Sequence, residues 1–323
     1  MAAGVKPLTV EDFLESKRQS LALELLTDGT NLQRRIEGAN ISSPGLLLAG
    51  YTARFPRGRI QVLGETEISY LRSLAAEELR RVAGTFFDLD MPAVIVTKGL
   101  KVPPVVLEIA RERGVPMLRS QLKTGEFYRR VQPYLEEQFA PTTTMHGSLA
   151  DVYGVGLLFV GPSGIGKSEC VLDLVERGHR LVADDLVYIT RRGNDVLIGR
   201  GHELQRHHME IRGIGIIDIS ALFGIRAIRQ QKRIEVVVQL EEWSDRTYYD
   251  RTGLEAEEVE ILSVKVPKVI VPLNPGKNIT VISEVVAMNH LLKYSGIHAA
   301  AQFDKRLREA MRPIREYLEE DYE

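Results

Sequence analysis

The sequence has little cysteine: Cys170 is the only one among 323 residues. A single cysteine cannot form a disulfide within the chain, so a disulfide-stabilised scaffold is excluded and a cytoplasmic location is expected. Cys170 lies early in a segment that we expect to be helical. We interpret it as a small core residue rather than as a redox or catalytic thiol.

The sequence also lacks a hydrophobic run long enough to cross a bilayer and a signal-peptide pattern at its start, so we expect no membrane association. The 42 basic and 44 acidic residues give a formal net charge of −2, so no overall basic field indicates nucleic acid as a partner. Hydrophobic residues make up 44% of the chain, which is enough for sizeable cores, and the length favours two domains.

The first part of the chain alternates short apolar stretches with amphipathic ones, which is the pattern of an α/β layer. This part contains no phosphate-binding loop and no compact acid–base cluster, so its residues indicate no role. We predict an N-terminal α/β domain over residues 1–130 and a second domain over residues 131–323. In the first we expect strands at 60–64, 93–97 and 114–118, and helices at 8–27, 65–83, 103–112 and 125–139.

The second domain contains a phosphate-binding motif. Residues 161–168 read GPSGIGKS and match the P-loop pattern G-x-x-x-x-G-K-[ST] at every fixed position. The preceding residues, 155–160, predict a buried strand, and the following residues, 169–177, predict a short helix that ends at Gly178. Strand, glycine-rich turn and helix are the context in which this motif binds phosphate.

Each part of the motif has a physical role in that chemistry. Its glycines permit backbone angles that a Cβ would forbid, so amide groups form a nest for phosphate oxygens. Lys167 has the length to reach β- and γ-phosphates, and the Ser168 hydroxyl is the expected Mg²⁺ ligand. The candidate nucleotide-binding residues are Gly161, Pro162, Ser163, Gly164, Ile165, Gly166, Lys167 and Ser168.

Two adjacent acids, Asp184 and Asp185, interrupt an apolar stretch that we expect to be a strand, residues 181–189. Buried carboxylates are costly unless a metal, a positive partner or solvent from a cleft compensates them. Neighbouring residues on a strand point to opposite faces, so both acids can face one phosphate only if the strand kinks or ends there. The alternative is an exposed acid pair, but the short crossover from the P-loop favours an acid beside the phosphate site.

Further candidates follow the acid pair. The segment 210–218 reads as a thin strand punctuated by glycines, with charged residues at its ends. Glu210 is a candidate second oxygen ligand for Mg²⁺, and Arg212 is a candidate phosphate clamp, although an ordinary edge strand would explain these residues equally well. Arg251 either stabilises charge on a transferring phosphoryl group or pairs with a neighbouring acid.

Taken in order, these motifs resemble the HPr kinase/phosphorylase family. The resemblance is close over roughly residues 130–305, and it is weaker but compatible in length over the N-terminal part. A P-loop alone would specify only a nucleotide binder, whereas the ordered set is specific. The resemblance is carried by His146-Gly147, Gly161 to Ser168 followed by Glu169, Asp184-Asp185, Glu210 to Asp218, Arg251 after an aspartate, and Val266-Pro267-Lys268 leading to Asn274-Pro275-Gly276-Lys277.

The resemblance implies a bifunctional enzyme. Members phosphorylate a serine on HPr, the phosphocarrier protein of the sugar phosphotransferase system, with ATP or pyrophosphate as donor. They reverse the reaction by phosphorolysis, in which inorganic phosphate is the acceptor and pyrophosphate the product. Members are bacterial, cytoplasmic homohexamers. The resemblance also implies the fold, an N-terminal α/β domain plus a catalytic P-loop kinase domain that resembles the phosphoenolpyruvate carboxykinase core.

The resemblance also implies roles for single residues. Asp185 is expected to be the acid/base that takes the serine proton and returns it in the reverse direction, with Asp184 in a supporting metal or orientation role. Ser168 and Glu210 are the expected Mg²⁺ ligands, beside the catalytic Lys167. His146 and Arg251 match the family's catalytic histidine and active arginine.

The chain departs from the family pattern in one loop, residues 272–277, which the family associates with dephosphorylation. The family often carries arginine where this chain has Asn274, and again where it has Lys277. Lysine cannot make the planar two-pronged contact that arginine makes with phosphate. We therefore expect retained kinase activity and weaker phosphorolysis.

Two other functions compete with this interpretation. A small-molecule P-loop kinase or a carboxykinase-like enzyme would turn over ATP with a metabolite and ignore a protein acceptor. A non-enzymatic nucleotide sensor would bind ATP without turnover. The paired acids favour chemistry over sensing, because a sensor needs no second acid beside the metal.

Overall fold

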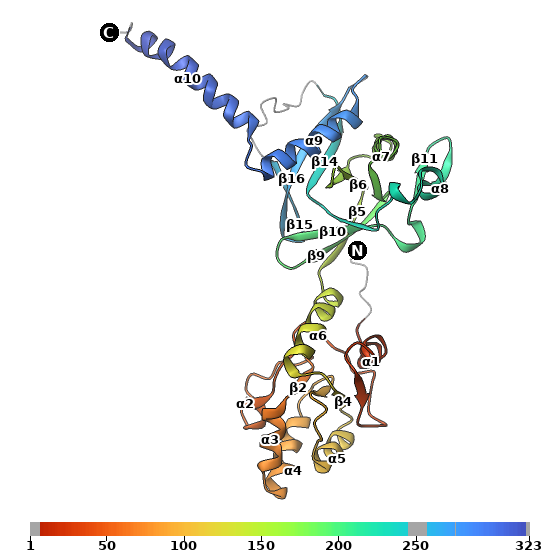
Figure 1. Cartoon of the computed structure of the whole chain (residues 1–323), viewed down its shortest axis with the longest axis vertical. Helices are drawn as coiled ribbons and strands as arrows, with labels where there is room; N and C mark the ends of the chain where they lie inside the picture. The colour runs from red at the N-terminus through yellow and green to blue at the C-terminus, as the bar shows by residue number, and fades with distance from the viewer. Residues whose placement is uncertain (1–6, 245–256, 275, 321–323) are drawn as a thin grey trace. The chain divides into compact units, whose positions relative to one another are not determined.

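The computed structural model describes residues 7–244, 257–274 and 276–320. The chain forms two compact units, one that ends at Ala140 and one that begins at Pro141. Figure 1 shows the strands and helices of each unit. The boundary expected at residues 130 and 131 lies inside helix α6, Thr124–Gln138, whose apolar face packs into the core of the first unit.

The N-terminal unit is a four-stranded sheet with helices on both faces. Its strands are β1 (Leu23–Leu25), β2 (Gln61–Leu63), β3 (Val94–Val96) and β4 (Met117–Ser120), in the spatial order β1-β4-β3-β2. Strands β2, β3 and β4 are parallel, and β1 runs antiparallel to β4. The expected α/β layer is confirmed.

Alternation along β3 explains why both faces of this sheet are covered. Val94 and Val96 point into one core and Ile95 into another, because successive side chains on a strand face opposite ways. The helices α3 (Glu65–Ser73), α4 (Ala76–Phe87) and α5 (Pro104–Glu112) supply the first core, together with the short α2 (Gly45–Leu48). The helices α1 (Val10–Lys17) and α6 supply the second.

Two expected helices differ from the observed ones. The helix expected over 8–27 begins at the predicted cap, since Thr9 and Asp12 form a capping box, but it ends at Lys17. The chain then turns through Ala22, at φ 48°, into β1. The helix expected over 65–83 is split, because Leu74 and Ala75 adopt extended backbone between α3 and α4.

The C-terminal unit is built on two sheets. The six-stranded sheet has the order β15-β16-β14-β7-β6-β8, and the four-stranded sheet has the order β13-β10-β9-β5. Buried side chains of both sheets form one core between them. The strands are β5 (Thr142–His146), β6 (Ser148–Val152), β7 (Val155–Val160), β8 (Arg180–Ala183), β9 (Leu186–Arg192), β10 (Val196–Arg200), β13 (Gln231–Arg233), β14 (Val236–Glu242), β15 (Glu257–Ile261) and β16 (Val264–Leu273).

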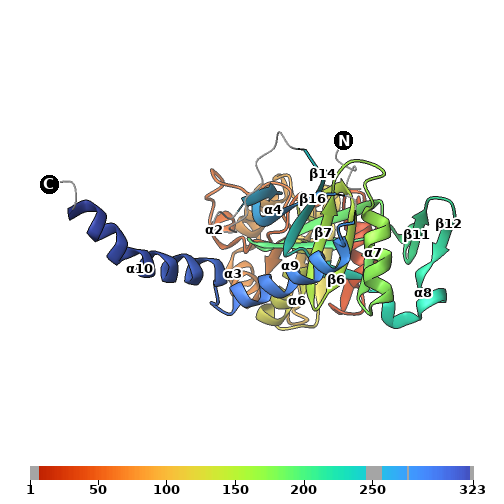
Figure 2. The same cartoon turned by 90° about the horizontal axis from the view of Figure 1, so that it is seen from above.

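Two helices cover the other face of the six-stranded sheet. They are α7 (Lys167–Glu176) and α9 (Ile279–Tyr294), and Figure 2 shows α9 running along the sheet with α7 beside it. Cys170 lies in this core, and burial raises the pKa of its thiol to about 11, so the thiol stays protonated at neutral pH. The core interpretation of Cys170 is confirmed.

Three smaller features complete this unit. A hairpin of β11 (His208–Ile211) and β12 (Gly215–Asp218) leads into the short helix α8 (Ile219–Phe223). Helix α10 (Ala299–Glu320) extends beyond α9 and away from the sheets in both views. Within the residues that the structure describes, no helix is long and apolar enough to cross a membrane.

Candidate active site

The P-loop lies between β7 and α7, as the sequence predicts. Gly161, Gly164 and Gly166 all have positive φ, at 148°, 82° and 100°. Residues with a Cβ rarely adopt such backbone angles, so glycine is favoured at these turns. Helix α7 starts directly after Gly166 without a side-chain cap, which leaves its first amides directed at the loop.

Gly161 is also required for steric reasons. A Cβ at this position would lie 2.5 Å from the carbonyl oxygen of Leu240 in the neighbouring strand β14. Such an approach is closer than any real carbon contact, so a side chain here would push the loop away from the sheet. The parallel pairing of β7 with β14 therefore sets where the loop leaves the strand.

Lys167 folds back over the loop. Its ammonium donates hydrogen bonds to the carbonyl oxygens of Gly161, at 3.0 Å, and Pro162, at 2.8 Å. The positive charge is thereby held at the concave side of the loop, where phosphate oxygens would lie.

Asp184 lies beneath the P-loop. Its carboxylate accepts hydrogen bonds from the Ser168 hydroxyl, at 3.0 Å to each oxygen, and from Ser148, at 2.5 Å. The residue is buried, and burial raises the pKa of this carboxyl while the two serine hydrogen bonds act in the opposite direction. Asp184 therefore contacts Ser168, the residue that the P-loop motif predicts to bind the metal.

Asp185 points elsewhere because the strand stops at the acid pair. Strand β8 ends at Ala183, and Asp185 has φ 63°, so the chain turns before β9 begins. The Asp185 side chain is 70% exposed, and its carboxylate lies 3.9 Å from Nδ1 of His146. The sequence predicts that both acids can serve one site only if the strand kinks or ends at them. The structure shows that strand β8 ends directly before them.

His146 is positioned by the turn between β5 and β6. The amide of Gly147 donates a hydrogen bond to the carbonyl oxygen of Asp185, at 3.0 Å. A Cβ at residue 147 would collide with the backbone of Phe159, so this turn passes close to β7 just before the P-loop. The imidazole is 84% exposed and shares the outer side of the site with Asp185.

Of the segment 210–218, the structure brings Arg212 to the P-loop. Its guanidinium donates a hydrogen bond to the Ser163 hydroxyl, at 3.3 Å. The segment is a hairpin rather than the single strand expected, because the chain turns at Gly213, at φ 83°, before β12 begins at Gly215, at φ 102°. In the described part of the chain, Glu210 is an exposed residue of β11 that forms no hydrogen bond or ion pair, whereas Arg212 lies in the turn that follows the strand.

Arg251 lies outside the described residues. In the loop after β16, the Lys277 ammonium donates to the carbonyl oxygen of Pro272, at 2.7 Å, and its amide donates to that of Asn274. Sequence reasoning overlooked Ser148, whose only signal was a hydroxyl directly after the His146-Gly147 pair.

A phosphate loop between a parallel strand and a helix, with an acid hydrogen-bonded beneath it, has the geometry of a P-loop nucleotide-binding site. The model of the HPr Serine kinase C-terminal domain matches residues 137–307, and that of the HPr Serine kinase N terminus matches residues 8–135. The chain therefore belongs to the HPr kinase/phosphorylase family.

Individual relatives are similar over most of their length. The HPr kinase/phosphorylase of Chloroherpeton thalassium is 48% identical over 98% of this chain and 97% of its own. That of Geobacillus kaustophilus is 47% identical over 91% and 94%. Among solved structures, the Hpr(Ser) kinase/phosphatase from Coxiella burnetii is 32% identical, with a TM-score of 0.45, and the match covers 50% of this chain and 98% of that one.

Proposed function

We propose that this enzyme phosphorylates a serine on an HPr-type phosphocarrier protein, with ATP or pyrophosphate as donor, and reverses the reaction by phosphorolysis. The observation that supports this function most is that the two neighbouring acids have different environments. Asp184 is buried against Ser168 of the P-loop, whereas Asp185 is exposed beside His146, where a protein acceptor has access. Membership of the HPr kinase/phosphorylase family supports the choice of acceptor.

Asp185 acts as the acid/base in this proposal. A general base must come within hydrogen-bonding distance of the proton it removes, and Asp185 carries the exposed carboxylate of the pair. In the forward direction it accepts the serine proton. In the reverse direction it returns that proton to the serine oxygen as phosphate takes the phosphoryl group, by microscopic reversibility. Lys167 and Arg212 hold the phosphates during both steps.

The residues beneath the loop fit a magnesium ion. The Ser168 hydroxyl and the Asp184 carboxylate supply the oxygen ligands that Mg²⁺ prefers, and a cation would compensate a carboxylate that burial otherwise disfavours in its charged form. When bound, Mg²⁺ neutralises charge on the phosphates. Glu210 belongs to the proposal as a further ligand on the strength of the family resemblance alone.

Homohexamer formation and a cytoplasmic location are implied by the family. Exposed apolar side chains on α9 and α10, among them Met288, Leu291 and Phe303, are compatible with contacts between subunits. Weaker phosphorolysis follows from Asn274 and from Lys277, whose ammonium is directed at its own loop.

Intact-mass spectrometry of an HPr-type protein tests the proposal. The acceptor is incubated with the enzyme, Mg²⁺ and either ATP or pyrophosphate, beside the Lys167→Ala variant. The expected result is one added phosphate on a serine, from either donor, absent with the variant and removed by excess inorganic phosphate. Unchanged mass with several HPr-type acceptors, despite ATP binding, would favour a metabolite kinase or a nucleotide sensor.

A further inference from the structure

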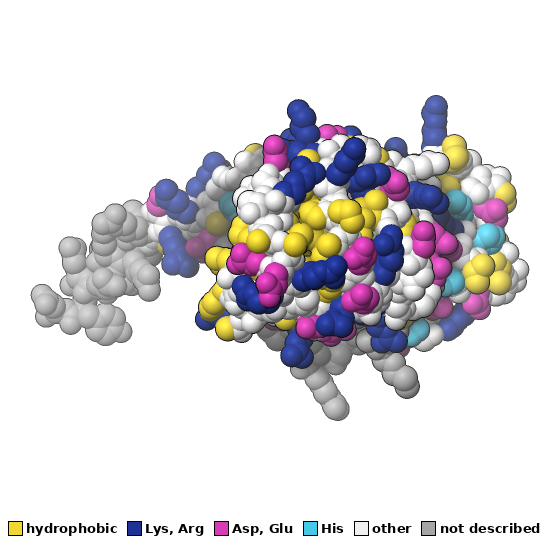
Figure 3. Space-filling view, turned by 90° about the horizontal axis from the view of Figure 1, so that it is seen from below, with side chains coloured by type: hydrophobic (Ala, Val, Ile, Leu, Met, Phe, Trp, Pro, Cys, Tyr) yellow, Lys and Arg dark blue, Asp and Glu magenta, His cyan; other side chains and the backbone are white. Residues whose placement is uncertain are grey.

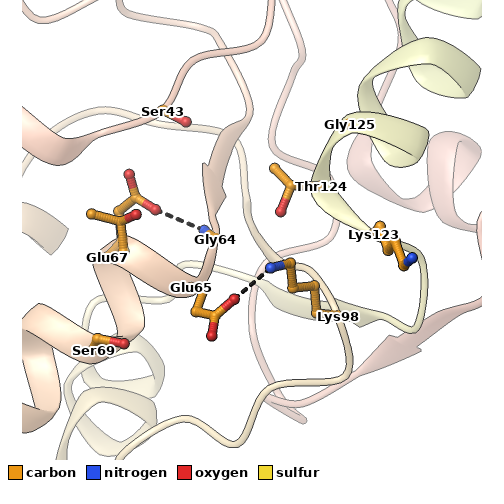
Figure 4. Close-up of a pocket in the computed structure, with 10 residues that line it drawn as sticks. Ser43, Gly64, Glu65, Glu67, Ser69, Lys98, Lys123, Thr124 and Gly125 are labelled. Atoms are coloured by element: carbon orange, nitrogen blue, oxygen red, sulfur yellow. Dashed lines mark hydrogen bonds and ion pairs between the residues drawn. The ribbon is translucent and has the colours of Figure 1, made fainter.

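Polar side chains of this protein meet both at its surface and in its interior. On the face that Figure 3 shows, basic and acidic side chains are interspersed at the surface. The ion pair of Glu65 with Lys98 in Figure 4 is also exposed, and exposed pairs add little to stability. In the C-terminal unit, by contrast, buried polar side chains of α9 contact α7, the helix that follows the P-loop. Buried polar contacts fix geometry, because a partner left unpaired would be costly.

Two polar contacts join α9 to α7. The Thr280 hydroxyl donates a hydrogen bond to the Asp173 carboxylate, at 3.3 Å. The Glu284 carboxylate, one turn further along α9, accepts hydrogen bonds from the Arg177 guanidinium, at 2.8 and 2.7 Å. Thr280 is 4% exposed and Glu284 is 6% exposed, so water competes little for either contact. Since Asp173 and Arg177 are also one turn apart, two points on each helix are fixed, and α9 cannot slide or pivot on α7 without breaking a contact.

Both helices begin at the same edge of the six-stranded sheet. Strands β7 and β16 each run parallel to β14, which lies between them, so their carboxyl ends point the same way. The P-loop leaves β7 and enters α7, while the loop after β16, residues 274–278, enters α9. Neighbouring strands lie about 4.8 Å apart, so the two loops leave strands that are about 10 Å apart. Open α/β sheets bind their ligands at this edge.

Thr280 lies where this loop becomes a helix. Asn278 is the N-cap of α9, and its side-chain oxygen accepts an amide of the first turn, at 3.0 Å. Directly before the cap, the Lys277 ammonium donates to the carbonyl oxygen of Pro272. The loop is therefore bonded to the first turn of α9, and Asp173 holds that turn from α7. A movement of the start of α9 would move Lys277 relative to the P-loop.

We propose that Thr280 is a positioning residue for the reverse reaction proposed above, on which this role rests: through Asp173 it holds residues 274–278 beside the P-loop. In phosphorolysis, an oxygen of inorganic phosphate forms a bond to phosphorus while the bond to the serine oxygen breaks, and Asp185 supplies the proton that the serine oxygen takes. Two phosphate groups must be held together for this step, and free phosphate has no ribose or base to add contacts. Its binding therefore depends on the relative position of the two loops more than the binding of ATP does.

Steady-state phosphorolysis of serine-phosphorylated HPr by the full-length enzyme tests this proposal. Thr280→Val keeps the shape of the side chain and removes its hydroxyl. We expect the KM for inorganic phosphate to rise about three- to tenfold, as for the loss of one hydrogen bond, while kcat and KM of the ATP-dependent kinase reaction stay within about twofold. Thr280→Ser should restore the wild-type KM, since it keeps the donor. Adding Asp173→Ala to Thr280→Val should raise the KM no further, because both changes remove the same contact.

Ser283→Ala is the matched control. The Ser283 hydroxyl is also buried on α9, but it donates to the carbonyl oxygen of Ile279 in the same helix, at 2.8 Å, and makes only a weak contact with the Cys170 sulfur, at 3.8 Å. An unchanged KM for phosphate in Thr280→Val, or the same rise in Ser283→Ala, would overturn the positioning role. Equal losses in the kinase reaction and in phosphorolysis would also overturn it, because they would indicate a general loss of structure. A wild-type enzyme that phosphorylates HPr but forms no pyrophosphate from the product would instead overturn the proposed reverse reaction, and the role of Thr280 with it.

Discussion

At the scale of single residues, the paired acids are the main feature of the candidate active site. Asp184 and Asp185 are adjacent in the sequence, yet one is buried against Ser168 and the other is exposed beside His146. The end of β8 and the left-handed backbone of Asp185 cause this separation. Two chemically identical side chains therefore have different environments. Because of this difference, one of two neighbouring residues can act as a metal ligand and the other as an acid/base.

The two acids should respond differently to amide substitution. Asp185→Asn removes the exposed carboxylate, so we expect the rate of phosphoryl transfer to fall by about 10²–10⁴ while nucleotide affinity is kept. Single-turnover assays with bound ATP, together with calorimetry of nucleotide binding, measure both quantities. An Asp185→Asn enzyme that retained the wild-type single-turnover rate would contradict the assignment.

For Asp184→Asn we expect a different defect. Its carboxylate is hydrogen-bonded to Ser168, so its loss should raise the Mg²⁺ concentration needed for half-maximal activity by about tenfold or more. Titration of activity with Mg²⁺ gives this value, and Ser148→Ala, which removes only a hydrogen bond to the same carboxylate, is the matched control. An unchanged Mg²⁺ requirement would remove Asp184 from the proposed metal site.

The residue scale also shows what a sequence can predict. The P-loop was predictable because its turn is set by local sequence, and the motif itself fixes glycine at 161 and 166, two of the positions with positive φ. Arg212 was foreseen as a phosphate clamp, but its contact with Ser163 depends on a hairpin that the sequence was not expected to form. Glu284 was not singled out, because its partners Arg177 and His179 are more than 100 residues away in the chain.

At the scale of elements, Glu284 links the helix of the P-loop to α9. Its buried carboxylate accepts two hydrogen bonds from Arg177 at the end of α7, at 2.8 and 2.7 Å, and contacts Nε2 of His179 at 3.1 Å. The Arg177 guanidinium holds the pKa of this carboxyl at about 2, far below its usual value of 4.5. This ion pair therefore anchors α7, and with it the start of the helix that faces phosphate.

Glu284→Gln should lower the free energy of unfolding by about 2 kcal/mol near pH 7, since it removes a charge-assisted pair from a buried group. The pKa of Glu284 is depressed in the folded state, so its contribution is complete above about pH 4.5 and is lost as the pH falls towards about 2. Urea unfolding at several pH values measures the difference between wild type and variant, with Glu176→Gln as the exposed control. A difference that did not shrink between pH 5 and pH 2 would contradict this account.

The loop between β16 and α9 makes a second prediction for an element. Asn274→Arg would restore a guanidinium, which binds phosphate oxygens in a planar two-pronged contact. We expect the rate of phosphorolysis to rise about tenfold, with little change in the rate of the ATP-dependent kinase reaction, which is not the reverse of phosphorolysis. Pyrophosphate release from serine-phosphorylated HPr gives the rate, and Asn274→Gln controls for side-chain length. Unchanged phosphorolysis in Asn274→Arg would contradict the role given to this loop.

Most elements followed from local patterns, and the exceptions have physical causes. Strand β7 occupies the predicted residues, 155–160, because a continuous apolar run before a glycine turn has few alternatives. The segment 181–189 was expected to be one strand, yet it divides into β8 and β9 where two carboxylates need different surroundings. The hairpin at 208–218 had a signal, the Arg212-Gly213-Ile214-Gly215 sequence, whose glycines permit a turn.

At the scale of the whole molecule, the two-unit organisation was predictable from composition and element order, but the position of the division was not. Helix α6 continues across the expected boundary because Phe127, Val131 and Leu135 are buried in the N-terminal core. The amphipathic pattern marked these residues as core without saying which core they join. Tertiary packing, which pairs distant segments, decides that question.

If one site works in both directions, a single substitution in it must affect both reactions, and the most direct measurement follows both reactions in one variant. Wild type and Asp185→Asn are compared for serine phosphorylation of HPr from pyrophosphate, and for pyrophosphate formation from phosphorylated HPr and phosphate. We expect the two rates to fall together, by the same factor. Loss of one reaction with the other at its wild-type rate would contradict a shared acid/base.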